Sequence, residues 1–190
     1  MTCVPRTFIA CFRSYVWTNF WSHKNHYRLL EAFSNFSKSN NEIKLVFTGY
    51  IDRSKSLKLQ EYIKHLKINK DKVLHLGYLD KYEYQTISSN SLGLIFPSLL
   101  GPDNLPPIDF MSMNKPVALS KHEGHIEQTL NQCYYFNPYS IKEIEEALLW
   151  LISKEANYNG QSYKKEFLID PNRYGQELIK KSIENLIPEI

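Results

Sequence analysis

Apolar residues in this chain gather into short runs that alternate with amphipathic stretches. Each run is three or four residues long and almost wholly apolar, which is typical of strands buried on both faces of a parallel sheet. The alternation itself indicates a sheet with helices packed on its faces. The runs are Tyr15–Trp17, Leu45–Phe47, Val73–Leu76, Leu94–Phe96, Val117–Leu119 and Tyr134–Phe136.

The stretches between the runs have the periodicity of helices that cover a sheet. Apolar residues recur three or four positions apart, as in Leu29–Phe36, so that each stretch presents one apolar face. Asp80 with Glu83, and Ser140 with Glu143, have the spacing of capping boxes at helix starts. The sequence therefore predicts an α/β fold, a doubly wound Rossmann-like parallel sheet flanked by helices, whose ligands bind at the carboxyl ends of the strands.

The length suits one domain. The chain has 190 residues, and one domain commonly takes about 100 to 200. We expect residues 1–14 to be an extension or linker remnant and residues 15–155 to form the ligand-binding domain. Residues 156–190 are expected to be a loop and a closing helix that opens at Asp170-Pro171.

Charge and hydropathy exclude several classes of partner. The formal net charge is +3, and the lysines are scattered among glutamates, so no nucleic acid is expected as a partner. The longest apolar stretches, Leu92–Leu100 and Ala147–Ile152, fall short of the ~20 residues of a transmembrane helix. The sequence therefore allows peripheral contact with a membrane at most.

The cysteines and the amino terminus point to a cytoplasmic location. Cys3, Cys11 and Cys133 lack the spacing of zinc ligands or of a CxxC pair, and are expected to be reduced thiols. Arg6 and Arg13 interrupt the apolar region that a signal peptide would need. No export is indicated.

The most unusual segment is the loop after the fourth apolar run. Residues 97–109 read Pro-Ser-Leu-Leu-Gly-Pro-Asp-Asn-Leu-Pro-Pro-Ile-Asp and lead into a predicted helix. The N–H groups and the dipole at a helix amino terminus favour a phosphate. Because the two consecutive prolines have no N–H, backbone donors would come chiefly from Asn104, Leu105 and Ile108.

Two charged residues could act at the same edge. Asp109 lies one turn into the helix, where its carboxylate can accept hydrogen bonds from vicinal hydroxyls such as those of ribose, or can merely complement the helix dipole. Lys24, in the segment Asn-Phe-Trp-Ser-His-Lys-Asn-His of residues 19–26, can approach the phosphate, or can be a solvated surface lysine. The turns at Gly49 and Gly77 permit close approach to a flat base, or are simply tight turns.

A histidine-containing segment follows the fifth run. Residues 121–127 read Lys-His-Glu-Gly-His-Ile-Glu, and His122 and His125 are three positions apart. Gly124 interrupts the pair and no further ligand is evident, so no metal site is expected. The segment is interpreted as a surface loop, with Glu127 in the first turn of the next helix.

Taken together and in order, these motifs resemble the carboxyl-terminal, donor-binding domain of GT-B glycosyltransferases. The similarity is to the retaining enzymes of glycosyltransferase family 4, also called group 1, and covers roughly Tyr15–Ile152. It implies one half of a GT-B fold. The segments that carry it are residues 19–26, 45–49, 73–78, 96–98, 101–109, 115–117 and 135–138.

The resemblance implies retaining transfer of a hexosyl group from a nucleotide diphosphate sugar to a glycan or lipid-linked acceptor, in polysaccharide biosynthesis. The nucleotide sugar is a substrate, and neither a cofactor nor a metal is implied. No catalytic residue is assigned. The implied site residues are Lys24, Asn104 and Leu105 for the donor diphosphate, Gly101 and Asp103 for the donor sugar, Asp109 for the ribose, and Gly77, Tyr78 and Leu79 beside the base.

The sequence departs from the family pattern in three ways. The usual paired glutamates, eight positions apart, would fall at Gly101 and Asp109, although the Gly-Pro-x-Asn-x-Pro-Pro loop is a variant found among bacterial polysaccharide-type members. The arginine that often precedes the lysine is absent. The third departure is that the sequence has no room for the family's amino-terminal, acceptor-binding domain, which would come from another polypeptide if the chain is complete. The alternatives are therefore a non-catalytic nucleotide-sugar-binding module and an epimerase of GT-B fold.

Overall fold

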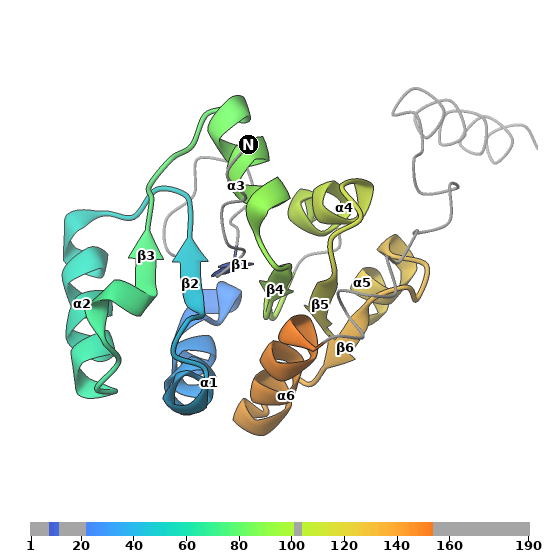
Figure 1. Ribbon diagram of the computed structural model, residues 1–190. Helices are drawn as coiled ribbons and strands as arrows, with labels where there is room; N and C mark the ends of the chain where they lie inside the picture. Colours follow the sequence, from blue (N-terminus) through green and yellow to red (C-terminus); the bar gives the residue numbers. More distant parts are fainter. Residues whose placement is uncertain (1–7, 12–21, 101–103, 154–190) are drawn as a thin grey trace, which may run out of the picture.

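The computed structural model describes residues 8–11, 22–100 and 104–153, which form a sheet of six strands covered by helices (Figure 1). The strand order is β3-β2-β1-β4-β5-β6, and every neighbouring pair is parallel. This is the order of a doubly wound Rossmann-like sheet, whose switch point lies between β1 and β4. The strands are β1 (Phe8–Cys11), β2 (Lys44–Phe47), β3 (Val73–His75), β4 (Leu94–Phe96), β5 (Val117–Ser120) and β6 (Tyr134–Phe136).

The first strand differs from the sequence-based expectation. β1 falls within residues 1–14, which were expected to precede the domain, and lies between β2 and β4 in the sheet. The expected strand at Tyr15–Trp17 lies outside the described residues. Phe8–Cys11 is as apolar as the other runs, but Arg6 and Arg13 on either side of it indicate in the sequence only an interrupted signal peptide.

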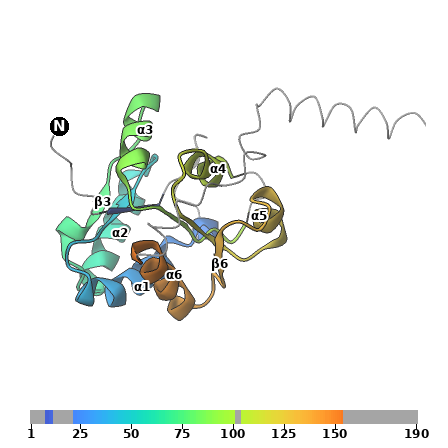
Figure 2. The same ribbon diagram turned by 45° about the vertical axis from the view of Figure 1, so that its right-hand side comes forward.

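Helices cover both faces of the sheet, with α1 and α6 on one side and α3 and α4 on the other (Figure 2). Two short 3₁₀ turns, η1 (Ser22–Lys24) and η2 (Lys70–Lys72), precede α1 and β3. In the described residues, no helix is both long and apolar enough to cross a membrane. The helices are α1 (His26–Ser39), α2 (Arg53–His65), α3 (Lys81–Asn90), α4 (Leu105–Ser112), α5 (Glu123–Gln128) and α6 (Ile141–Ile152).

Each face of the sheet has its own apolar core. Alternate residues of a strand point to opposite faces. Ile95 of β4 accordingly belongs to the core that includes residues of α1, α2 and α6, whereas Leu94 and Phe96 belong to the core that includes residues of α3 and α4. Phe33 of α1 and Phe110 of α4 are fully buried in the two cores. The strands are therefore held from both sides, and the loops at their carboxyl ends start from a rigid base.

The two expected capping boxes behave differently. Asp80 accepts a hydrogen bond from the N–H of Glu83, whose carboxylate accepts one from the N–H of Asp80, so this box is complete. At α6 the Ser140 side chain accepts from the N–H of Glu143, but the Glu143 carboxylate accepts from the N–H of Asn137 instead of Ser140. The second box is thus only half formed, because the preceding turn offers Glu143 another donor. The closing helix expected from residue 170 lies outside the described residues.

Candidate functional site

The segments that follow β1 and β4 meet at the carboxyl edge of the sheet, beside the switch point. The N–H of Leu99, after β4, donates to the carbonyl of His23 in η1 over 2.6 Å. The Lys24 ammonium donates to Oδ1 of Asn104 at the start of α4 over 3.1 Å. It also lies 4.9 Å from the centroid of the Phe96 ring, at the end of β4. The structure therefore brings together two segments that are 80 residues apart.

Asn25 orients the segment that contains Lys24. It has φ 58° and ψ 32°, the left-handed conformation that asparagine tolerates better than most residues. Its side-chain amide donates to the carbonyl of Pro138 over 2.7 Å, and its Oδ1 accepts from Arg28 over 3.0 Å. The chain thus turns sharply between η1 and α1, and the turn is anchored to the loop that follows β6.

The amino terminus of α4 lacks the side-chain cap that an asparagine usually provides. Asn104 is the N-cap residue, but its side chain makes no capping hydrogen bond. An N-cap side chain accepts from the second or third N–H of the helix, and these positions are Pro106 and Pro107. The Asn104 amide therefore bonds to Lys24 and to His125 instead.

Asp109 lies on α4 and is held by α3. The Tyr84 hydroxyl donates to Oδ2 of Asp109 over 2.9 Å. Burial raises the pKa of the Asp109 carboxyl above its ordinary value, and the hydrogen bond from Tyr84 opposes the rise. Its other oxygen, Oδ1, accepts no hydrogen bond from the part of the chain that the structure describes. One carboxylate oxygen is fixed, and the other can accept hydrogen bonds from hydroxyl groups of a ligand.

The turn at residues 77–79 follows β3 at the same edge. Gly77 has φ 70°, and its carbonyl accepts from the N–H of Gly49 over 2.6 Å after β2. Leu79 packs against the core that includes Phe110 of α4, whereas the Tyr78 side chain is 68% exposed. The turn therefore lies on the face of α3 and α4, with its tyrosine toward solvent.

Of the other predicted residues, Leu105 is the first residue of α4 and is exposed. Gly101 and Asp103 lie outside the described residues, so their predicted contacts with a sugar stay predictions. Among the residues described, no three His, Cys, Asp or Glu side chains are grouped so that they could hold a metal ion.

The interpretation of residues 121–127 as a surface loop was wrong. β5 ends at Ser120, α5 begins at Glu123, and the His125 side chain is fully buried. Its Nδ1 lies 2.9 Å from the carbonyl of Ser120 and its Nε2 lies 2.9 Å from Nδ2 of Asn104. The four-residue spacing of His125 and Thr129, both fully buried, was a helical signal, but Gly124 obscured it.

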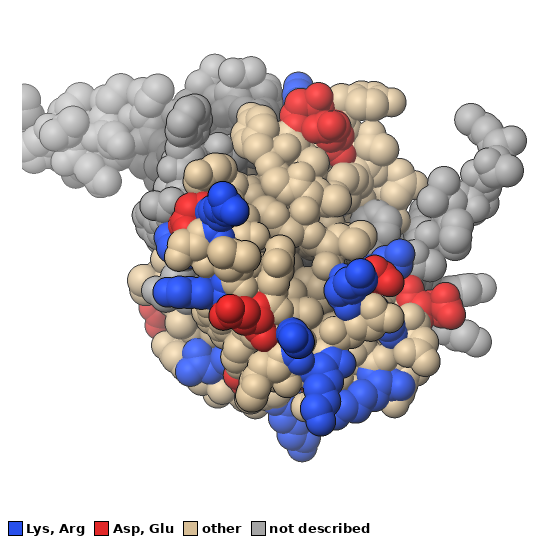
Figure 3. Space-filling view, turned by 90° about the vertical axis from the view of Figure 1, so that its left-hand side faces the viewer, with Lys and Arg blue, Asp and Glu red and all other residues tan. Residues whose placement is uncertain are grey.

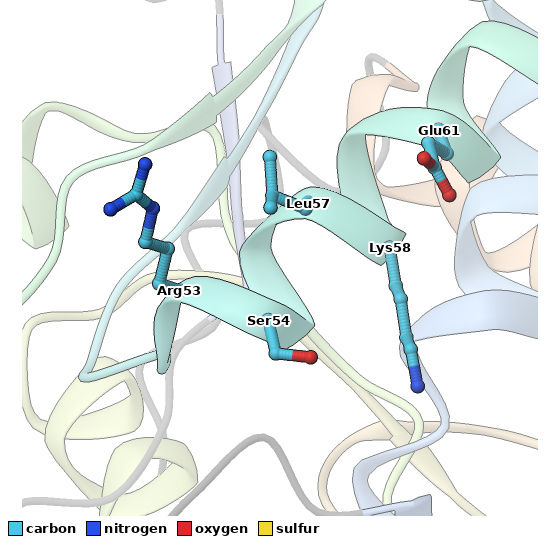
Figure 4. A pocket seen from close by; sticks show the side chains of 5 residues that line it. All are labelled: Arg53, Ser54, Leu57, Lys58 and Glu61. Carbon is cyan, nitrogen blue, oxygen red and sulfur yellow. The ribbon is translucent and has the colours of Figure 1, made fainter.

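A surface hollow lies on α2, outside the site around Lys24 and Asp109. It is lined only by residues of α2, namely Arg53, Ser54, Leu57, Lys58 and Glu61 (Figure 4). Because a single helix lines it, the hollow cannot enclose a ligand. Figure 3 shows the side of the molecule that α2 forms, where Lys and Arg side chains gather toward the lower end, opposite to the carboxyl edge. Neither feature shares a residue with the site around Lys24 and Asp109.

Comparison with known sequences supports the resemblance to group 1 glycosyltransferases. The family model for glycosyl transferases group 1 matches residues 16–167. The O-antigen chain mannosyltransferase RfbU of Salmonella typhimurium is 30% identical over 128 residues, which are 67% of this chain and 35% of that protein. The chain thus spans about a third of the length of this curated relative.

Solved structures agree in fold. The E. coli trehalose-6-phosphate structure bound with UDP-2-fluoro glucose aligns with a TM-score of 0.74 and 13% identity, over 96% of this chain and 45% of its own. Sucrose-phosphate synthase from Thermosynechococcus elongatus aligns with a TM-score of 0.76 and 15% identity, over 97% of this chain and 47% of its own. The expected doubly wound fold, corresponding to about half of a GT-B enzyme, is confirmed. This chain belongs to the glycosyl transferases group 1 family.

Proposed function

We propose that this chain binds the nucleotide diphosphate sugar of a retaining glycosyltransferase, which transfers a hexosyl group to a glycan or lipid-linked acceptor. The observation that carries the proposal is the contact of Lys24 with Asn104 at the amino terminus of α4. It puts a cation beside a helix end that has no side-chain cap, which is an arrangement suited to a diphosphate. The likeness to an O-antigen mannosyltransferase supports a hexosyl donor and a role in polysaccharide assembly.

The diphosphate would lie between Lys24 and α4. The N–H groups of Asn104 and Leu105 and the helix dipole supply fixed positive potential, and Lys24 adds a full charge. When the bond between the anomeric carbon and the phosphate oxygen breaks, negative charge grows on the leaving diphosphate. Groups that are already oriented toward that charge stabilise it without reorganisation. Gly101 and Asp103 are proposed to contact the sugar.

The nucleoside would extend toward α3. Oδ1 of Asp109 is proposed to accept hydrogen bonds from the ribose hydroxyls, while Tyr84 holds Oδ2. The base would then lie beside Gly77, Tyr78 and Leu79, on the same face of the sheet. The acceptor would be held by a second Rossmann-like domain, on this polypeptide or on another one.

Calorimetry with UDP, GDP and ADP tests donor binding. We expect at least one of them to bind with micromolar to millimolar affinity. Lys24→Ala should weaken this binding by ~1 to 3 kcal/mol, the contribution of a hydrogen bond to a charged group. Lys64→Ala is the matched control, because Lys64 is exposed in the last turn of α2 and belongs to the opposite end of the sheet. The absence of heat with all three nucleotides, on folded protein, contradicts the proposal.

Sugar transfer needs a separate assay, because Gly101 stands where the family pattern has its first glutamate. This difference favours the second candidate, a module that binds the donor without transferring it. The chain would be mixed with an acceptor-domain protein and UDP-glucose or GDP-mannose, and transfer and hydrolysis would be measured. Nucleotide binding without either reaction would select the module.

A further inference from the structure

A row of three hydrogen bonds connects the end of β5 to the ammonium group of Lys24. Its direction is fixed at both ends, because the Ser120 carbonyl can only accept and the Lys24 ammonium can only donate. Nδ1 of His125 must therefore donate to Ser120, over 2.9 Å. In the neutral ring this leaves Nε2 as an acceptor, which takes a hydrogen from Nδ2 of Asn104 over 2.9 Å. Oδ1 of Asn104 then faces Lys24, over 3.1 Å.

The middle of this row is closed to water. The His125 side chain is fully buried and Asn104 is 2% exposed. Nε2 of Gln128, also on α5, donates to the carbonyl of Asn104 over 3.0 Å, so α5 holds both the backbone and the side chain of this residue. If this buried amide turned over, it would lose its hydrogen bonds to Lys24 and His125, which is costly in a site without water. The orientation of Asn104 thus depends on the acceptor that His125 provides.

We propose that His125 is a positioning residue for the nucleotide sugar: its neutral, Nδ1-protonated ring turns Oδ1 of Asn104 toward Lys24 and so holds the ammonium at the amino terminus of α4. This inference rests on the proposed function, because it assigns Lys24 to the diphosphate. Its own content is the coupling between the protonation of His125 and the position of Lys24.

Protonation of His125 reverses the row. Nε2 would become a donor that faces the Asn104 NH₂ group, and the amide would have to turn over. The NH₂ group would then face the Lys24 ammonium, and two donors repel each other. Burial lowers the pKa of His125, the nearby charges of His122 and Lys24 lower it further, and the hydrogen bond to Ser120 opposes this. The ring is therefore neutral at neutral pH, and Lys24 is released only in acid.

Among the residues that the structure describes, few other groups near His125 titrate. The ring of His122, at the start of α5, lies 4.4 Å away between centroids, and its Nε2 lies 2.9 Å from the carbonyl of Ser98. Tyr135 of β6 contacts Thr129, one turn further along. The face toward β4 is the apolar ring of Phe96. His122 is consequently the residue whose titration must be separated from that of His125.

Nuclear magnetic resonance on the unliganded protein tests the row without any nucleotide. Histidine labelled with ¹⁵N reports the tautomer, and we expect Nδ1 of His125 to carry the hydrogen at pH 7. The side-chain resonance of Lys24 should then shift at the same midpoint as that of His125, also in a His122→Gln variant. The proposal is overturned if the neutral ring of His125 carries its hydrogen on Nε2, or if the Lys24 resonance does not change as His125 titrates.

Affinity measurements test the consequence for the ligand. UDP-glucose, GDP-mannose and ADP-glucose are suitable probes, because their esterified diphosphates do not gain protons between pH 5 and pH 8. We expect the affinity of whichever probe binds to fall about tenfold as the pH is lowered from 8 through the midpoint at which the His125 resonance titrates, because one hydrogen bond to a charged group is lost. His125→Gln, whose amide oxygen can accept from Asn104 but does not titrate, should keep the affinity and lose the pH dependence.

Two further variants complete the experiment. His122→Gln should keep the pH dependence, with a midpoint slightly above that of the wild type, because the charge that lowers the pKa of His125 is removed. His125→Leu should weaken binding about tenfold at every pH, because it offers Asn104 no acceptor. A His125→Gln variant with the wild-type profile, or a His125→Leu variant with wild-type affinity, overturns the coupling. If no probe binds at any pH, the proposed function fails, and the resonances of His125 and Lys24 decide the present inference alone.

Discussion

Replacing Asp109 with asparagine should stabilise the domain and weaken its binding of nucleotide. Burial raises the pKa of this carboxyl, so the folded chain binds a proton more tightly than the unfolded chain does. Such a group adds stability below the unfolded pKa of about 4 and loses that contribution as pH rises through the folded pKa. At neutral pH the ionised, half-buried carboxylate therefore destabilises the fold. Asparagine removes the charge and can still accept the hydrogen bond from Tyr84.

The loss of binding can be estimated from the hydrogen bonds that the carboxylate would make. A hydrogen bond to a charged group contributes about 1.5 to 3 kcal/mol and a neutral one about 0.5 to 1.5 kcal/mol. If Asp109 accepts hydrogen bonds from two ribose hydroxyls, the neutral amide of asparagine would contribute about 1 to 1.5 kcal/mol less binding free energy at each, or about 2 to 3 kcal/mol less in total. Asp109→Asn should therefore bind nucleotide about 30- to 150-fold more weakly.

Urea denaturation at pH 7 and pH 4, together with calorimetry, would measure both effects. The stability gain of Asp109→Asn should be present at pH 7 and shrink at pH 4, where the wild-type carboxyl takes up its proton. Tyr84→Phe should lower the stability at pH 7, since it removes the hydrogen bond that opposes the cost of burial. Asp71→Asn, which alters an exposed carboxylate of η2, is the matched control. A destabilised Asp109→Asn protein with unchanged nucleotide affinity would refute the reasoning.

Three other predictions concern the fold. Gly93 directly precedes β4, and in Gly93→Ala the new Cβ would lie 2.5 Å from the carbonyl oxygen of Pro116. We expect urea denaturation to show that the free energy of unfolding falls by about 2 to 4 kcal/mol, because of overpacking and a weakened strand hydrogen bond. Wild-type stability would contradict this packing. Asp80→Ala should cost about 0.5 to 2 kcal/mol through the cap of α3, measured in the same way, and a smaller change would mean that the cap is replaced by water. Burial raises the pKa of Cys133 to about 12. Alkylation of this thiol at pH 8, measured by peptide mass spectrometry, should therefore be slow until urea unfolds the chain. Rapid modification of the folded protein would show that the thiol is accessible.

Most of the sheet could be predicted from the sequence because its strands are buried on both faces. Such strands leave continuous apolar runs, and the runs at Leu45–Phe47, Leu94–Phe96 and Tyr134–Phe136 coincide with β2, β4 and β6 to within one residue. β1 was missed for a physical reason. Its four residues look no different from the others, and only their pairing with β2 and β4, which is a tertiary fact, identifies them as the middle of the sheet.

The meeting of Lys24 with the start of α4 could also be predicted, because β1 and β4 flank the switch point of a doubly wound sheet and their loops must leave it side by side. The role of His125 could not. His125 follows His122 by three positions with Gly124 between them, and this local pattern occurs both on surface loops and in buried turns of a helix. Burial was decided by how tightly α5 follows β5.

Asn104 is an intermediate case, because its sequence neighbours already restrict what its side chain can do. An asparagine at the start of a helix normally caps the second or third N–H, and here both positions are proline. The sequence alone therefore excludes the ordinary cap and requires the Asn104 amide to find partners elsewhere. It does not name them, since Lys24 is 80 residues away and His125 is 21. Two prolines in the first turn after an asparagine are thus a signal that the side chain of this residue takes part in a tertiary contact.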